Sequence, residues 1–197
     1  MARIIMNATM SLDGFIAAPD DNPGPLFEWY ENGDVEYRGS DPRMTFKVSR
    51  ANADYLDRFW PRIRCDLIGR HLFDITNGWD GHPAQGEHVF VVTHKAPTDW
   101  GHPDAPFTFV TDGVASAVKQ AAAFAGKDGL VALTAGNVGG QALALGLVDE
   151  IGIDLAPVVM GRGKRFFGDF DGDQFLLDDP EVVATERVLH LRYVIRR

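Results

Sequence analysis

The sequence predicts an α/β protein built around a mostly parallel β-sheet, with antiparallel strands at its C-terminal edge. Short apolar runs rich in β-branched residues alternate with helical patterns along most of the chain. This alternation is typical of parallel sheets covered on both faces. The last two apolar runs, residues 181–186 and 188–195, have no helix between them and are expected to pair as antiparallel strands. We expect a single domain spanning residues 1–197.

Hydrophobic spacing places the individual elements. Apolar or alternating runs predict strands at residues 2–10, 65–69, 88–93, 107–110, 130–133 and 150–159. Helices are expected at 45–59, where apolar residues recur every three or four positions, and at 114–125 and 137–145, each followed by a glycine. Residues 18–42 are rich in Pro, Gly, Asp and Asn, and predict a long loop with a short helical piece at 26–31.

Composition excludes several classes of protein. With 45% hydrophobic and 24% charged residues, the chain is expected to be globular and ordered. Its 28 acidic residues exceed its 19 basic ones and give a net charge of −9, so nucleic acid is not expected as a partner. The single cysteine, Cys65, excludes an internal disulfide. Neither a membrane-length apolar run nor a signal peptide is recognisable, so we expect a cytoplasmic protein with no membrane partner.

No metal site is predicted. Residues 169–173 resemble a calcium-binding loop, but the glycine stands at the fourth position and Pro180 replaces the bidentate glutamate. The six histidines are dispersed without the spacing of metal ligands.

A polar turn follows the first predicted strand. Ser11-Leu12-Asp13-Gly14-Phe15 lies where that strand ends, and ligands bind at this end of the strands in open α/β sheets. The alternative is an ordinary Asp-Gly turn with a solvated carboxylate, which needs no ligand.

Two clusters of basic and hydroxyl side chains follow two further strands. They are Gly69-Arg70-His71 and Thr93-His94-Lys95. Glycine lets the backbone approach a phosphate, and arginine offers a planar fork that suits phosphate oxygens. Together the clusters predict a local cationic pocket in an otherwise acidic chain. Taken alone, Gly69-Arg70-His71 is equally consistent with a surface arginine beside a helix start.

A glycine-rich turn joins the strand at 130–133 to the following helix. It reads Thr134-Ala135-Gly136-Asn137-Val138-Gly139-Gly140-Gln141. Such turns direct backbone N–H groups and the positive end of a helix towards a phosphate. The glycine spacing is not that of a Rossmann dehydrogenase, so that class is not expected. Tight packing of the helix on the sheet is the alternative reason for these glycines.

With these motifs, the chain resembles the dihydrofolate reductase-like superfamily, and most closely the reductase (C-terminal) domain of the riboflavin-biosynthesis deaminase-reductase and its free-standing relatives. The resemblance is carried by residues 10–17, by Ile68-Gly69-Arg70-His71, and by 135–151 followed by 156–163. It implies a three-layer α/β fold, NADPH bound across the carboxyl edge of the sheet, and a homodimer. The zinc motifs of the deaminase module are absent, and the embedded carboxylate of true dihydrofolate reductases is not recognisable.

The resemblance also implies a role for each motif. Gly69, Arg70 and His71 match the segment that holds the adenosine phosphate and pyrophosphate, and Thr93, His94 and Lys95 match the strand end at the 2′-phosphate. Thr134, Ala135, Gly136, Asn137, Val138 and Gly139 match the turn at the pyrophosphate. Asn7, Ala8 and the turn at 11–15 fall where nicotinamide and substrate meet. Asp13 is therefore expected to hydrogen-bond the substrate, with general-acid catalysis as a weaker option.

The function implied by the resemblance is NADPH-dependent reduction of a small heterocyclic substrate. A ribosylaminopyrimidine or a pterin would fit, as in the amino-(phosphoribosylamino)uracil reductase of riboflavin biosynthesis. Two alternatives stay open, namely a nucleotide-binding module without catalysis and a diverged dihydrofolate reductase. Residues 18–42, with Phe27, Trp29 and Tyr30, are expected to lie over the substrate and exclude water.

Overall fold

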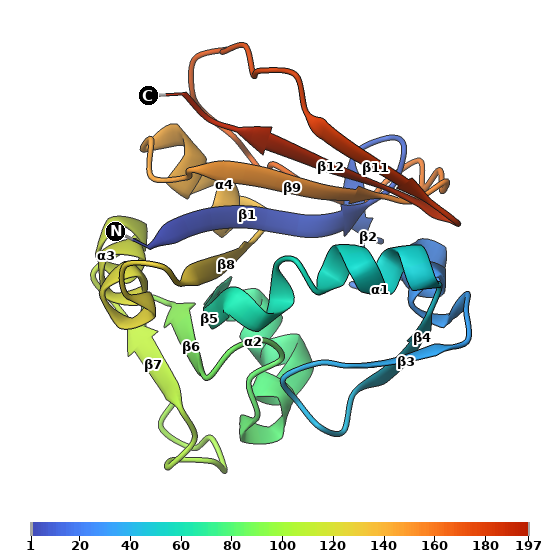
Figure 1. Ribbon diagram of the computed structural model, residues 1–197. Coiled ribbons are helices and arrows are strands. Elements are labelled where there is room, and N and C mark those ends of the chain that lie inside the picture. Colours follow the sequence, from blue (N-terminus) through green and yellow to red (C-terminus); the bar gives the residue numbers. More distant parts are fainter. Residues whose placement is uncertain (1, 197) are drawn as a thin grey trace.

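The computed structural model of the protein describes residues 2–196, which form a sheet of eight strands flanked by helices (Figure 1). The sheet has the strand order β11-β12-β9-β1-β8-β5-β6-β7. Its strands are β1 (Arg3–Met10), β5 (Ile63–Gly69), β6 (His88–Val92), β7 (Phe107–Val110), β8 (Leu130–Thr134), β9 (Glu150–Leu155), β11 (Glu181–Thr185) and β12 (Val188–Val194). The α-helices are α1 (Arg50–Leu56), α2 (Arg70–Thr76), α3 (Val114–Ala125) and α4 (Asn137–Ala144).

The six strands from β9 to β7 are parallel, and β12 and β11 add an antiparallel edge. This arrangement confirms the predicted fold class, including the antiparallel C-terminal pair. Because parallel strands end at the same edge of a sheet, the segments that follow β1, β5, β6 and β8 lie along one edge. These are the segments that carry the sequence motifs.

Side chains alternate between the two faces of each strand, and helices cover both faces. On one face, Met6 and Leu133 belong to the main core, which also includes the buried side of α3 and part of α4. On the other face, Ile68 packs with Phe73 of α2, and Trp60 covers the sheet beyond α1. The site residues are thus fixed to a sheet that is held from both sides.

The helix predicted at 45–59 is wrong in its first part. Residues Thr45–Val48 form a strand, β4, which pairs with β3 (Val35–Arg38) in a separate antiparallel hairpin. Ser49 then caps α1 by accepting a hydrogen bond from the Asn52 backbone N–H at 3.3 Å. Apolar residues two apart, such as Phe46 and Val48, fit a strand as well as a helix. The pairing with β3, which is distant in the sequence, decides between them.

Residues 18–42 are more ordered than predicted. They contain a 3₁₀ helix, Gly24–Glu31, in addition to β3. Trp29 is fully buried, stacks on Tyr30 at 3.8 Å, and donates from Nε1 to Thr9 Oγ1 at 3.2 Å. Trp29 is therefore a core residue, whereas Phe27 is exposed.

Further elements differ from the prediction, and α2 was not predicted. The strand expected at 150–159 ends at Leu155, because Pro157 follows and has no N–H to continue the sheet. The short pair β2 (Phe15–Ala17) and β10 (Lys164–Arg165) was not predicted and lies outside the main sheet. Among residues 2–196, no helix is long and apolar enough to cross a membrane.

Candidate functional site

The predicted motifs meet along the carboxyl edge of the sheet. β8 lies between β1 and β5, and β6 is the next neighbour of β5. Asn7 of β1 is in register with Thr134 of β8, and its carbonyl accepts the Ala135 N–H at 3.3 Å. The turn at 11–15, the glycine-rich turn and the two cationic clusters are therefore neighbours in space.

Arg70 joins the two cationic clusters. Its Nη1 donates to the Lys95 carbonyl at 2.8 Å and to Thr93 Oγ1 at 3.4 Å, and its Nε donates to Asp74 at 2.7 Å. His94 and Lys95 are exposed beside it. Arg70, Thr93, His94 and Lys95 thus lie at the ends of β5 and β6, where Arg70 also pairs with the Asp74 carboxylate. The cationic pocket itself stays a prediction.

His71 lies next to the loop that follows β2. Its Nε2 is 2.7 Å from Asp21 Oδ1, and the Lys164 ammonium is 3.4 Å from the same oxygen. The hydrogen bond with His71 lowers the pKa of Asp21. The Asp21 carboxylate is therefore stabilised by His71 and Lys164, which come from different parts of the chain.

The glycine-rich turn is partly covered by a segment that the sequence did not place there. The Gly136 N–H donates to the Phe166 carbonyl at 2.6 Å, and Asn137 Oδ1 accepts the Asp169 N–H at 3.0 Å. Gly136 has a φ of +93°, which favours glycine. A Cβ on Gly139 would lie 2.7 Å from the Thr134 carbonyl oxygen, so this glycine is required for tight packing. The packing interpretation therefore holds for Gly139.

Asp13 anchors a loop from the C-terminal half of the chain. Its carboxylate accepts hydrogen bonds from Ser11 Oγ at 2.6 Å, from the Met160 N–H at 3.0 Å and from the Gly161 N–H at 2.6 Å. These bonds, that from Ser11 foremost, lower the pKa of Asp13 to about 2. An acid that is ionised at neutral pH is a poor proton donor, which argues against the general-acid role.

An open groove lies beside the Asp13 turn. It has a volume of about 590 Å³ and is lined by Ala18, Pro19, Asp20, Pro25, Val158, Val159, Met160 and Arg162. One wall is the loop that Asp13 holds, and the other is the start of the 18–42 segment. Residues 18–42 therefore do border an open space at this edge.

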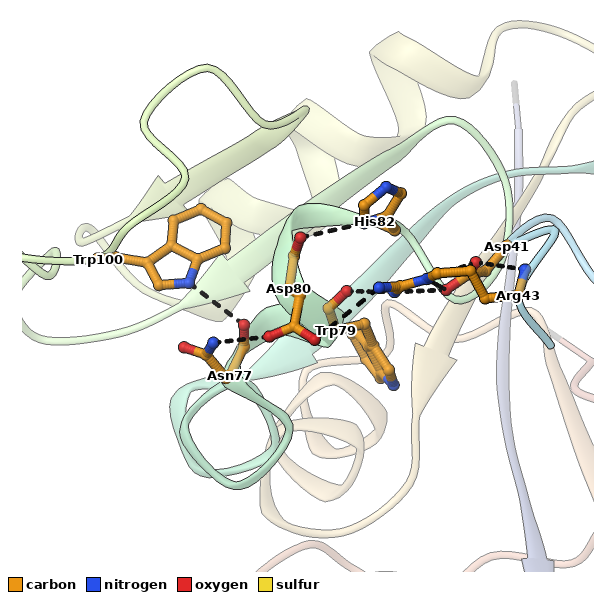
Figure 2. Close-up of polar contacts among 7 residues, drawn as sticks. All are labelled: Asp41, Arg43, Asn77, Trp79, Asp80, His82 and Trp100. Atoms are coloured by element: carbon orange, nitrogen blue, oxygen red, sulfur yellow. Dashed lines mark hydrogen bonds and ion pairs between the residues drawn. The ribbon is translucent and has the colours of Figure 1, made fainter.

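A turn with left-handed backbone follows α2 and was not predicted from the sequence. Asn77, Gly78, Trp79 and Asp80 have φ values of 49°, 57°, 48° and 53°, which is left-handed backbone. Such backbone costs about 1–2 kcal/mol for each non-glycine residue. Figure 2 shows how it is held: Arg43 Nη2 donates to the Trp79 carbonyl at 2.6 Å, and Trp100 Nε1 donates to the Asn77 carbonyl at 3.2 Å. Asn77-Gly78 and Asp80-Gly81 are local signals for such a turn, because Asn, Asp and Gly adopt positive φ most readily. Trp79 carries no such signal, and its backbone is held by the distant Arg43.

A buried polar row on the sheet face beneath α1 was also missed. Arg192 of β12 is in register with Gly152 of β9, which is in register with Asn7 of β1. In the adjacent row, His190 Nδ1 lies 2.7 Å from Asp154 Oδ1. The alternation of His190 and Arg192 with apolar residues in the last strand was the available signal, because it places both on one face.

The fold and its row of strand-end motifs define an α/β protein of the dihydrofolate reductase-like type. The chain belongs to the family of the RibD C-terminal domain, whose model matches residues 2–191. A relative from Bacillus subtilis (strain 168), the uncharacterized protein YyaP, is 27% identical over 180 residues, which cover 85% of this chain and 81% of the relative.

Solved structures share the fold at low sequence identity. A candidate riboflavin biosynthesis protein from Shewanella sp. PV-4 has a TM-score of 0.67 at 20% identity, with all of both chains covered. A pyrimidine reductase-like protein from Corynebacterium diphtheriae has a TM-score of 0.58 at 15% identity, with 100% and 93% covered. The deaminase/uracil reductase of Thermotoga maritima has a TM-score of 0.59 at 12% identity, and this chain spans only 56% of its length.

Proposed function

We propose that the protein is an NADPH-dependent reductase of a small heterocyclic substrate of the ribosylaminopyrimidine or pterin kind. Membership of the RibD C-terminal family supports the reaction class. The observation that carries the proposal is the contact of Arg70 with Thr93 and with the Lys95 backbone, which joins two cationic clusters at the carboxyl edge. In open α/β sheets this edge is where nucleotides bind.

The residues present fit a dinucleotide phosphate. Arg70 and Lys95 supply positive charge, Thr93 and His94 supply hydrogen bonds, and Gly69 lets the backbone approach closely. The acidic total charge opposes an anion, but charges beyond a Debye length of about 8–10 Å are largely screened at physiological salt. Within that distance Arg70 is paired with Asp74 at 2.7 Å, so Lys95 would supply the positive charge that is not already balanced by this pair.

The bound dinucleotide would supply the hydride, and the chain would supply position and a dry surface. Asn7 and Ala8 lie on β1 where nicotinamide and substrate would meet, and the Asp13 loop would form the outer wall. Asp13 would act as an ionised hydrogen-bond acceptor for the substrate or for its own loop. Holding both reactants in the reactive geometry would lower the barrier, because the entropy cost of bringing them together is met on binding.

The cofactor choice is tested by comparing dissociation constants for NADPH and NADH in the wild type, Lys95→Ala and Lys119→Ala, an exposed control on α3. Losing a charge-assisted hydrogen bond of roughly 1.5–3 kcal/mol should weaken NADPH by about one to two decades in Lys95→Ala and affect NADH less. Lys119→Ala should match the wild type. The phosphate pocket would be refuted if the wild type bound NADPH and NADH with nearly equal dissociation constants and Lys95→Ala did not change their ratio.

Turnover is tested separately by following NADPH oxidation with ribosylaminopyrimidine, pterin and dihydrofolate substrates. Oxidation with a ribosylaminopyrimidine or pterin supports the reductase. Binding of NADPH without turnover on the whole panel would instead support a nucleotide-binding module, and turnover on dihydrofolate alone would support a diverged dihydrofolate reductase.

We also propose that the protein is a homodimer that uses its C-terminal sheet edge. β11 has no neighbour on its outer side in the sheet, and Val182 and Leu189 are exposed there at 54% and 40%. An apolar edge strand of this kind is a liability in a monomer. Light scattering at micromolar concentration that gives a single 21.7 kDa species would refute this assembly.

A further inference from the structure

Asp21 connects two basic side chains from elements that are far apart in the sequence. His71 follows β5 at the start of α2, whereas Lys164 belongs to β10, which pairs with β2. His71 Nε2 and the Lys164 ammonium lie 2.7 Å and 3.4 Å from the same oxygen of Asp21, Oδ1. A single carboxylate oxygen therefore holds two basic groups together.

The segment that carries Asp21 crosses the glycine-rich turn. Ile16 Cδ1 of β2 lies 3.6 Å from the position that a Cβ on Gly136 would take, and the Gly136 N–H donates to the Phe166 carbonyl just after β10. From this cover over the turn, Asp21 reaches His71 beyond the end of β5. Its carboxylate therefore lies among the motifs that predict the phosphates of the cofactor.

The loop around Asp21 keeps its shape through its own backbone. The Ala18 N–H donates to the Asn22 carbonyl at 2.8 Å, and the Asp21 N–H donates to the Ala18 carbonyl at 3.0 Å. Asp21 has a left-handed φ of 70°, which aspartate adopts more readily than most residues. Rotation of the Asp21 side chain alone would therefore release both basic groups while the loop stays folded.

The bridge is accessible to an incoming anion. The exposed fractions of the side chains are 24% for Asp21, 43% for Lys164 and 62% for His71. Ion pairs at such positions shift an equilibrium by no more than about fivefold each, so they are readily exchanged. A pyrophosphate linkage has two negative charges and several acceptor oxygens, whereas Asp21 offers one charge. The linkage is therefore the stronger acceptor for the same two donors.

We propose that His71 and Lys164 form a subsite for the pyrophosphate of the cofactor, and that Asp21 occupies this subsite as an internal competitor until the dinucleotide displaces it. The proposal rests on the proposed function and deepens it, since it adds Lys164 to the cofactor site. The apparent affinity for the dinucleotide is then the intrinsic affinity multiplied by the fraction of molecules in which Asp21 is released.

An internal competitor selects among anions. Because Asp21 is tethered to the loop, it competes at an effective concentration in the millimolar range. Free phosphate or pyrophosphate below that concentration does not displace it. A dinucleotide makes further contacts along the carboxyl edge, such as those proposed for Arg70, and these offset the displacement. Asp21 is thus a specificity-determining residue for the cofactor over small anions.

The test compares the dissociation constants of inorganic pyrophosphate and of NADPH, measured by calorimetry, in the wild type, Asp21→Asn and Asp20→Asn. Asparagine keeps the size and the left-handed backbone of residue 21 but has no charge. Asp20→Asn removes the same charge one residue earlier and can still accept the Asn22 N–H. Asp21→Asn should bind both probes about three- to tenfold more tightly than the wild type, and Asp20→Asn should stay within about twofold of it.

Lys164→Ala separates displacement from a general effect of charge. In the wild type Asp21 already balances Lys164, so this substitution should weaken pyrophosphate binding by about twofold or less. In Asp21→Asn the ammonium is available to the probe, and the same substitution should weaken binding by about fivefold. Strictly additive effects of the two substitutions would overturn the proposal, because independent sites add.

Melting temperatures report whether each variant is folded. If Asp21→Asn is not, Asp21→Gly replaces it, because glycine adopts this φ without steric cost. NADPH binding by the wild type that removal of the Asp21 charge leaves unchanged or weakens would refute the internal competitor alone. Absence of NADPH binding in every variant would refute the proposed function, and absence of pyrophosphate binding in Asp21→Asn would refute the subsite.

Discussion

Gly69 and Val138 bring two of the strand-end motifs into direct contact. A Cβ on Gly69 would lie 2.9 Å from Val138 Cγ2, although the φ of Gly69, −86°, is accessible to any residue. Glycine is therefore required here for the close approach of β5 to α4, and not for its backbone freedom. This contact sets the distance between Arg70 and the glycine-rich turn.

Gly69→Ala should destabilise the protein by about 1–3 kcal/mol through overpacking, and should weaken NADPH binding as α4 moves away. Val138→Ala in the same chain removes the opposing methyl groups and should restore much of both losses. The measurements are urea unfolding and NADPH titration of the two single variants and the double variant. Strictly additive effects would mean that the two residues do not interact.

Asp13→Asn tests whether the Asp13 carboxylate serves the substrate or the loop. The asparagine keeps one acceptor oxygen and loses the other, so the bond from Met160 or from Gly161 must weaken. We expect turnover to fall while the NADPH dissociation constant stays within about twofold, because the cationic pocket lies two strands away. Loss of NADPH binding together with a lower melting temperature would identify Asp13 as a structural turn residue.

Asp66 should make stability fall as pH rises. Burial raises the pKa of this carboxyl to about 8, although the carboxyl accepts a hydrogen bond from the Gln85 N–H at 2.9 Å. Its unfolded value is near 3.9, so between about pH 4 and pH 8 the unfolded chain loses a proton that the folded chain keeps. The free energy of unfolding should then decrease by up to roughly 1.4 kcal/mol per pH unit across this window.

Asp66→Asn is the control for this pH dependence. Asn can still accept from Gln85 and does not titrate, so the slope between pH 4 and pH 8 should be reduced and the variant should be more stable than the wild type near pH 8. The comparison is made by urea unfolding at several pH values. Parallel curves for the two proteins would show that Asp66 is already ionised in the folded state.

Arg43→Ala should loosen the left-handed turn. Arg43 pairs with Asp41, which is 2% exposed, and holds the Trp79 carbonyl (Figure 2). Its side-chain hydrogen bond lowers the pKa of Asp41. Removal of the side chain leaves the buried Asp41 carboxylate with the backbone N–H of residue 43 as its donor, and the Trp79 carbonyl with the His82 N–H at 3.2 Å. We expect a loss of about 1–3 kcal/mol and faster amide exchange at residues 77–81.

Arg38→Ala provides the matched control, because Arg38 pairs with Glu36 on an exposed strand. An exposed pair of this kind contributes about 0–1 kcal/mol, so this variant should stay close to the wild type. Equal effects of the two substitutions would show that Arg43 acts only as a surface charge.

Local patterns in the sequence determined much of this structure. Apolar runs marked the strands of the main sheet, and helix-ending glycines marked α3 and α4, because both signals arise from residues that are neighbours in the chain. Since parallel strands end at one edge, the order of elements also brought the Asn7, Arg70, Lys95 and Thr134 motifs together.

Only the tertiary structure decided what each side chain does at that edge. Pairing with β3 made residues 45–48 a strand, and the Met160–Gly161 backbone turned Asp13 into a loop anchor. The buried row of Arg192, Gly152 and Asn7 depends on the register of strands that are far apart in the sequence. Register and long-range contacts are set by packing over the whole domain, so no local pattern carries them.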